Sequence, residues 1–295
     1  MSSYILSCCS TADLSEEHLR QRDIAYVCFH FELDGEPLLD DLGRSMPPEE
    51  LFRRMGEGAV TKTSHVSVEE YVGHFEPFLK EGKDIFHVTL SSGISDTYRS
   101  AQRAAKDLQA AYPDRKIFIV DSLAASSGYG LLMDMLADLR ERGMEAEELY
   151  QWTERNKLRL HHWFFSTDLT FYIRGGRISR TAGFIGTMLN ICPLLNVNRR
   201  GQLTPREKIR TKKKVMERIV ELMKRHANGG EDYQGKCYLC HSMCYEDARE
   251  VADLVAGAFP YLNGKPEIYP IGAAIGSHTG PGTVALFFWG DERNE

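Results

Sequence analysis

The first half of the chain alternates short apolar runs with longer stretches of helical periodicity. Runs such as YILSCC at residues 4–9, DIFHVTL at 84–90 and KIFIVD at 116–121 have the length and composition of buried strands. Between them, residues 67–82 and 98–112 space their apolar side chains as one face of a helix requires. Strands that alternate with helices predict a parallel sheet covered by helices on both faces.

The pattern changes in the second half, where apolar runs and helical stretches no longer alternate regularly. FIGTMLNICPLL at 184–195 has the character of an apolar helix, LLNVNRRGQL at 194–203 that of a strand, and KKKVMERIVELMKRH at 212–226 that of an amphipathic helix. We therefore predict an N-terminal α/β domain, residues 1–165, and a C-terminal α+β domain, residues 166–295.

Polar turns follow three of the predicted strands. They cover residues 8–13, 91–97 and 121–128, and the loop TKTSHVS at 61–67 is a further candidate. Ligands of parallel sheets gather outside the carboxyl ends of the strands, so these turns are expected to converge on one site.

The overall composition narrows the choice of partners. The 36 basic and 42 acidic residues give a net charge of −6, which disfavours nucleic acid. No apolar run approaches the roughly 18 to 20 residues of a membrane span, and the N-terminus lacks an export-signal pattern, so we expect a cytoplasmic protein. Seven cysteines, an odd number, then favour reduced thiols over a disulfide framework.

The turn LSSGISDTYRSA at 90–101 suits several kinds of chemistry. Gly93 and Ser95 begin the G-x-S-x-G pattern of a nucleophile elbow, but Thr97 stands where that pattern requires glycine. Neither G-x-x-x-x-G-K-[ST] nor G-x-G-x-x-G is present, so no nucleotide-binding loop is indicated. A serine-rich turn at a helix N-terminus still offers N–H groups and hydroxyls to an anion, a carboxylate included. Anion binding is favoured, with a serine hydrolase or acyltransferase that uses Ser95 and His278 as the alternative.

A short cysteine cluster resembles part of a zinc site. It contains Cys237, Cys240, His241 and Cys244, but strand alternation places Cys237 and Cys240 on opposite faces, and no matching ligand pair stands elsewhere. We therefore expect no metal and no cofactor.

A glycine-rich segment and two basic stretches are further candidates for ligand or partner binding. GSHTGPG at 276–282 is either a tight turn or a backbone through which His278 and Thr279 approach a carboxylate. The basic stretches at 173–180 and 208–226 are solvated faces by default, or they mark the approach of an acidic or phosphorylated partner.

Together these segments resemble, in order and over nearly the whole chain, the DegV family of bacterial fatty-acid-binding proteins. Seven motifs in register make this resemblance far more specific than any single one. They are STADL (10–14), TSHVS (63–67), SSGISDTYRSA (91–101), VDS (120–122), GGRIS (175–179), KIRTKKK (208–214) and GSHTGPGT (276–283).

The resemblance implies a lipid-binding protein without catalysis of its own. A tunnel between the two domains would hold one long-chain fatty acid of the palmitate, stearate or oleate class. The chain would be the acyl-binding subunit of a fatty acid kinase and present the carboxylate to a separate ATP-binding subunit. An acyl chain needs apolar walls, and residues 131–139 and 184–195 are the candidate lining.

The resemblance also implies roles for individual residues. Thr63 and Ser95 would hydrogen-bond the fatty acid carboxylate, and His278 would lie near it. Arg177 and Arg210 match basic positions that we expect nearer the kinase-docking surface.

The chain departs from the usual family pattern at several positions. His65 and Val66 replace Gln and Pro, Asp96 replaces Gly, Cys9 replaces Asp, and Cys192 replaces Lys. Because Thr63 and Ser95 are kept, carboxylate binding is the firmer expectation and the kinase partnership the weaker one.

Overall fold

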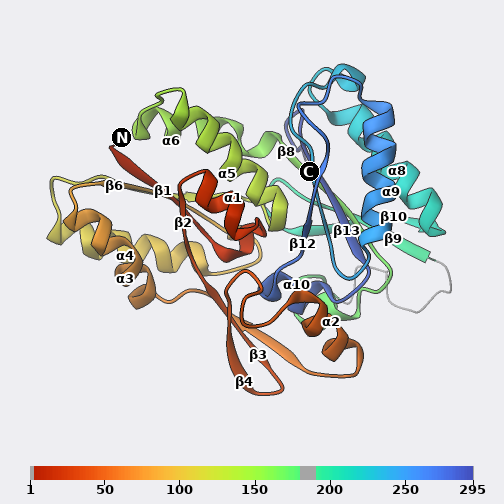
Figure 1. Ribbon diagram of the computed structural model, residues 1–295, viewed down its shortest axis with the longest axis horizontal. Coiled ribbons are helices and arrows are strands. Elements are labelled where there is room, and N and C mark those ends of the chain that lie inside the picture. The colour runs from red at the N-terminus through yellow and green to blue at the C-terminus, as the bar shows by residue number, and fades with distance from the viewer. Residues whose placement is uncertain (1–2, 180–190, 295) are drawn as a thin grey trace.

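The structure is a computed structural model that describes residues 3–179 and 191–294. Its N-terminal domain holds a four-stranded parallel sheet in the order β2-β1-β6-β7 (Figure 1). The strands are β1 (Tyr4–Cys9), β2 (Ile24–Val27), β6 (Asp84–Thr89) and β7 (Ile117–Asp121).

Helices cover both faces of this parallel sheet, as predicted (Figure 1). One face carries α3 and α4, and the other carries α1, α5 and α6. Their bounds are α1 (Glu16–Gln21), α3 (Val68–Lys80), α4 (Thr97–Ala111), α5 (Ser126–Glu141) and α6 (Ala146–Asn156).

A small antiparallel sheet is inserted between β2 and α3, and the sequence pattern did not predict it. Its order is β4-β3-β5, with β3 (Phe29–Leu33), β4 (Glu36–Asp40) and β5 (Thr61–Ser64), and α2 (Pro48–Gly56) lies between β4 and β5. In this sheet Thr63 pairs with Phe31. The insertion therefore supplies the strand that carries one of the predicted ligand-binding residues.

The C-terminal domain is built on a six-stranded mixed sheet in the order β10-β9-β8-β13-β11-β12. Only β11 and β12 pair in parallel. The strands are β8 (Leu160–Ser166), β9 (Ile191–Val197), β10 (Leu203–Arg210), β11 (Tyr238–His241), β12 (Glu267–Pro270) and β13 (Thr283–Trp289). The helices are α7 (Thr170–Arg174), α8 (Lys212–His226), α9 (Tyr245–Ala258) and α10 (Ala273–Thr279).

One sequence-based expectation needs correction in this half. The predicted domain boundary stays a prediction, and residue 165 lies within β8, which begins at Leu160 and pairs with β13 and β9 of the second sheet. Residues 191–195 belong to strand β9 rather than to an apolar helix, and the rest of that predicted helix lies outside the described residues. A short apolar run fits a buried strand or a buried helix equally well, and here β8 and β10 provide strand partners for its backbone.

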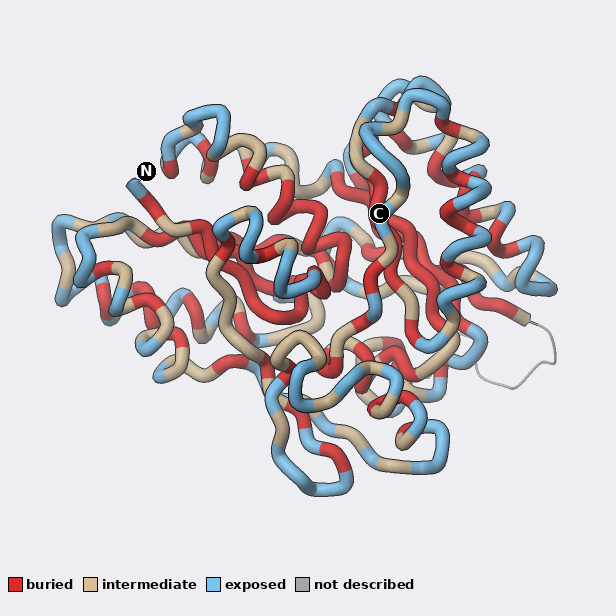
Figure 2. The backbone as a smooth tube through the Cα atoms, in the orientation of Figure 1, coloured by how far each residue is buried: buried red, intermediate tan, exposed pale blue. Residues whose placement is uncertain are grey.

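Helix α5 packs between the two large sheets. It contacts β11, β13 and β8, and most of its residues are buried. Figure 2 shows the buried positions continuing from the first sheet through α5 into the second. The residues at 131–139 are therefore ordinary core, and none of them lines the cavity described below.

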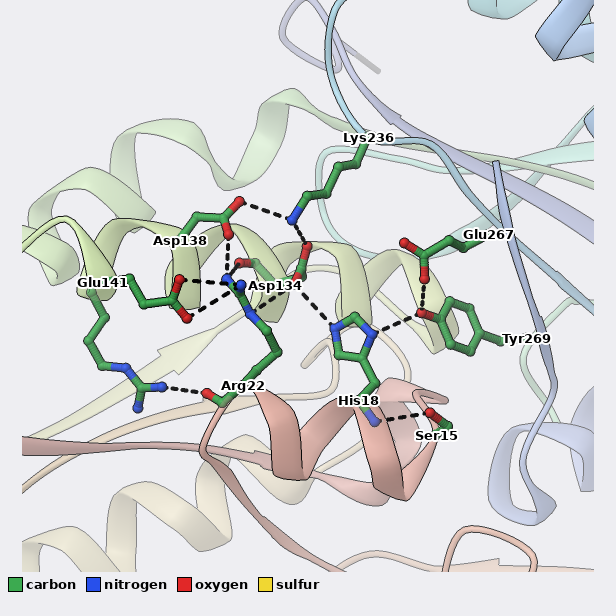
Figure 3. Close-up of polar contacts among 10 residues, drawn as sticks. Ser15, His18, Arg22, Asp134, Asp138, Glu141, Lys236, Glu267 and Tyr269 are labelled. Atoms are coloured by element: carbon green, nitrogen blue, oxygen red, sulfur yellow. Dashed lines mark hydrogen bonds and ion pairs between the residues drawn. The ribbon is translucent and has the colours of Figure 1, made fainter. Parts of the chain in front are cut away.

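A charged network joins the two domains at one edge of α5 (Figure 3). Asp134, which is 2% exposed, pairs with His18 and Arg22 of the first domain and with Lys236 of the second. Burial raises the pKa of Asp134, but hydrogen bonds from His18 and Lys236 and the charges of Lys236 and Arg22 outweigh burial and hold it well below its usual range. The ionised carboxylate thus fixes the two domains relative to each other.

Candidate functional site

A cavity of about 680 Å³ lies between the two domains and the small sheet. The polar turns at the carboxyl ends of β1, β6 and β7 reach it, as predicted for a parallel sheet. Much of its wall is apolar, with contributions from all three sheets and their connections: Phe29, Leu90, Phe164, Ile178, Leu203 and Phe287. Its size and mixed polar and apolar lining suit a small organic ligand.

The predicted residues Thr63 and His278 meet in the wall of this cavity. Thr63 lies on β5 and His278 in the last turn of α10, and Thr63 Oγ1 is 2.7 Å from His278 Nε2. Burial, aided by the charge of Arg177, lowers the pKa of His278 to about 4, so the imidazole is neutral near pH 7. A neutral imidazole orients the threonine hydroxyl without adding a charge of its own.

Ser95 lies in the turn between β6 and α4. Its Oγ accepts a hydrogen bond of 3.2 Å from the backbone N–H of Thr97, which leaves the hydroxyl hydrogen to be donated. The turn is held by Ser91, whose Oγ donates to Gly201 O at 2.8 Å and accepts from Gly93 N at 3.1 Å. The serine-rich motif lies within one short segment of the sequence. The turn that it forms is nevertheless held in place by a distant segment, the turn between β9 and β10.

Arg177 lies in the wall of the cavity, and its expected place near a kinase-docking surface stays a prediction. Its Nη1 donates to Gly175 O at 2.6 Å and its Nη2 to Ile94 O at 3.1 Å, so it joins the His278 side of the site to the Ser95 turn. Burial lowers its pKa, and no carboxylate in the described part of the chain pairs with it. Within residues 3–179 and 191–294 the guanidinium is thus a half-buried positive charge without a counter-ion.

Arg210 occupies a different place. It is exposed at the end of β10 and is not among the residues that line the cavity. Its expected role toward a partner stays a prediction.

The charge of Asp96 lies at the rim of the cavity and points into solvent. Its side chain is 68% exposed, and Arg99 Nη1 is 3.5 Å from its carboxylate. Solvent and Arg99 screen this charge, so it does not oppose anion binding deeper in the site.

Cys9 lies behind the Ser95 turn and is fully buried. Its Sγ is 3.2 Å from the Tyr71 hydroxyl, which is 2.6 Å from Thr97 Oγ1 at the start of α4. Burial raises the pKa of the Cys9 thiol to about 11, so it is neutral. Cys9 therefore supports the turn from below and adds no charge to the site.

The geometry does not support a serine hydrolase. His278 Nε2 is bonded to Thr63, and among the described residues its Nδ1 has no hydrogen-bond partner, so the acid of a triad is missing. Ser95 is bonded to the helix backbone instead of to a base.

The cysteine cluster is also not assembled into a metal site. Cys237 and Cys240 are fully buried, and Cys240 Sγ accepts a hydrogen bond from Ser126 Oγ at 3.3 Å. Within residues 3–179 and 191–294, these cysteines do not belong to a group of three ligand atoms close enough to share an ion.

The sequence analysis did not predict that the turn after β9 forms part of the cavity wall. Residues 202–205 line the cavity, and the preceding Gly201 has a φ of +71°, which favours glycine. The Arg-Gly pair at 200–201 was the available signal, but it marks a turn without showing which surface the turn faces.

The helices described in the structure include none long and apolar enough to cross a membrane.

Comparisons with known proteins agree with this architecture. A family model described as an uncharacterised protein of the DegV family matches residues 9–291. A DegV domain-containing protein of Clostridium perfringens is 36% identical over 294 residues, which is 99% of each chain.

Solved structures share the fold over almost the full length. One, titled for the fatty acid binding of a DegV family protein from Thermus thermophilus, has a TM-score of 0.87 at 26% identity and covers 98% of this chain and 99% of that chain. The fatty acid kinase B3 protein of Streptococcus pneumoniae, loaded with linoleic acid, has a TM-score of 0.84 at 20% identity and covers 99% and 100%. With the family model matching nearly the whole sequence and this architecture reproduced throughout, the chain belongs to the DegV family.

Proposed function

We propose that the protein binds one long-chain fatty acid in the cavity between its domains, with the carboxylate held by Thr63, Ser95 and Arg177. The observation that carries this proposal is the half-buried guanidinium of Arg177, which has no carboxylate partner among the described residues and lines the same cavity as the hydroxyls of Thr63 and Ser95. A carboxylate at this position would compensate the charge of Arg177 and accept from both hydroxyls.

The apolar wall supports an acyl tail as the rest of the ligand. Each buried methylene contributes roughly 0.8 kcal/mol, so fourteen methylenes would contribute roughly 11 kcal/mol before the cost of immobilising the chain. The tail therefore sets most of the affinity, and the polar residues fix which end of the ligand faces the Ser95 turn. Fatty acid binding by the structurally similar DegV family protein from Thermus thermophilus supports this ligand class.

We further infer that the bound acid serves a separate fatty acid kinase subunit. The chain has neither of the glycine-rich nucleotide motifs, so a second protein would supply ATP. Arg210, exposed on β10, stays the candidate for contact with that partner. The shared fold of the pneumococcal fatty acid kinase B3 protein is consistent with this assignment.

The test is to identify what the protein carries. Protein purified from a bacterial host should release a fatty acid of the palmitate, stearate or oleate class on denaturation, detected by mass spectrometry. The Thr63→Ala, Ser95→Ala double variant should carry less of it and bind added palmitate more weakly, because two neutral hydrogen bonds contribute about 0.5–1.5 kcal/mol each.

Ser64→Ala is the matched control, because Ser64 neighbours Thr63 on β5, is exposed and points to the opposite face. Protein that is empty and also fails to bind added palmitate or oleate would refute the proposal.

A further inference from the structure

The face of β8 turned away from the cavity carries a second group of polar side chains, made up of two histidines and an aspartate. His162 and Phe164 line the cavity, so their neighbours His161 and Trp163 point to the other face, against α8. There His161 meets His226, the last residue of α8, and Asp291, which follows β13. The three residues are distant in sequence and belong to three separate segments.

The polar atoms of these residues converge on one carboxylate oxygen. Asp291 Oδ1 is 2.9 Å from His161 Nε2 and 3.2 Å from His226 Nδ1. All three ligand atoms lie within 4.8 Å of one another. Ligand atoms around a tetrahedral Zn²⁺ are about 3.4 Å apart when the bonds are about 2.1 Å long, so modest side-chain rotations bring them to that geometry.

The segments that carry the ligands are held by the backbone. Asp291 N donates to His226 O at 2.9 Å, and Ala227 forms a bridge with Gly290. Trp289 pairs with Leu160 at the start of β8, and Figure 1 shows the C-terminus close to this strand. The ligand set is thus fixed by the fold, and only side-chain torsions need to adjust.

Burial differs among the three side chains in a way that suits a site open on one side. His161 is 5% exposed, His226 26% and Asp291 55%. The imidazole of His161 stacks on Phe288 and on His226, and His226 stacks on Trp163. The aromatic neighbours hold both rings toward the carboxylate, and Asp291 exposes this side of the cluster to solvent.

We propose that His161, His226 and Asp291 form a binding site for a divalent transition metal of the Zn²⁺ class. Two imidazole nitrogens and one carboxylate oxygen are ligands that Zn²⁺ accepts, and Cu²⁺ prefers imidazole as well. A bound ion would tie the segment after β13 to α8 and β8. This site is separate from the acyl cavity, and its role is to stabilise the C-terminal domain.

The experiment uses the full chain with its affinity tag removed and with bound metal stripped by EDTA. Calorimetric titration with ZnCl₂ should show one site, and Zn²⁺ should raise the melting temperature. Cu²⁺ should quench tryptophan fluorescence, because Trp163 stacks on a ligand ring.

His226→Gln and Asp291→Asn should each weaken Zn²⁺ binding by at least about tenfold. Both side chains are partly exposed, so the variants are expected to fold, and the melting temperature without metal checks this. His241→Gln is the matched control, since His241 is a half-buried histidine outside the cluster. Absence of Zn²⁺ binding by the wild type, or wild-type affinity in either ligand variant, would overturn the site and leave the fatty acid proposal untouched.

Discussion

Gly175 controls the position of His278 through the space that a missing side chain leaves. A Cβ atom at Gly175 would lie 2.2 Å from His278 Nδ1, whereas ordinary contacts are 3.4–4 Å. The Gly175→Ala variant therefore requires the imidazole to move by more than about 1 Å. Gly175 has a φ of −75°, which any residue adopts, so the effect of the substitution is steric alone.

The displaced imidazole cannot keep its bond to Thr63. The new methyl group presses on the Nδ1 side of the ring, and the opposite nitrogen is already only 2.7 Å from Thr63 Oγ1, so the ring must rotate. A neutral hydrogen bond contributes about 0.5–1.5 kcal/mol, so losing the orientation of Thr63 should weaken fatty acid binding about two- to thirteenfold.

The assay is displacement of a fluorescent fatty acid by oleate on delipidated protein. Gly73→Ala in α3 is the matched control, because a Cβ there meets open space and should stabilise the helix without changing affinity. If Gly175→Ala acts through His278, adding it to His278→Ala should have no further effect. Unchanged affinity of the single variant, or additive effects in the double variant, would refute the reasoning.

Two further predictions concern stability. Lys236→Met removes a cation from buried Asp134 at the domain interface, so the free energy of unfolding measured in urea should fall by about 2 kcal/mol. Lys106→Met, at an exposed lysine, is the control and should change this free energy by nearly zero. Equal losses in the two variants would contradict the role given to the network. Burial raises the pKa of Asp40 to about 6 from an ordinary value of 3.8, so the folded state holds this proton more tightly than the unfolded chain. The resulting stability is complete below about pH 4 and is lost as the pH rises through about 6. In Asp40→Asn the unfolding free energy should depend less on pH across this window, and an unaltered pH profile would count against the assignment.

The elements with strong local periodicity were predictable from the sequence. Outside the inserted antiparallel sheet, the alternation in the N-terminal domain correctly indicated a parallel sheet with helices on both faces, because each amphipathic segment must bury one face. The turns after β1, β6 and β7 line one cavity for the same reason: parallel strands end at one edge of their sheet. Thr63, Ser95 and His278 also line this cavity, and their roles toward a carboxylate stay predictions.

Where local pattern was ambiguous, tertiary partners decided the outcome. Residues 191–195 form a strand because β8 and β10 pair with them. Arg177 belongs to the cavity wall because the carbonyl groups of Gly175 and Ile94 hold its guanidinium there. The sequence alone does not show which way the side chain of a basic residue in a glycine-rich loop points.

By itself, the sequence determined the alternating architecture, the serine-rich turn and the family motifs, since each depends on residues close together in the chain. Only the tertiary structure decided which residues distant in the sequence come into contact. His161 and Asp291 are separated by 130 residues, and His226 and Asp291 by 65, yet one carboxylate oxygen lies between the two rings. Hydrophobic periodicity fixes which face of an element is buried, but contacts between distant elements depend on packing that no local pattern encodes.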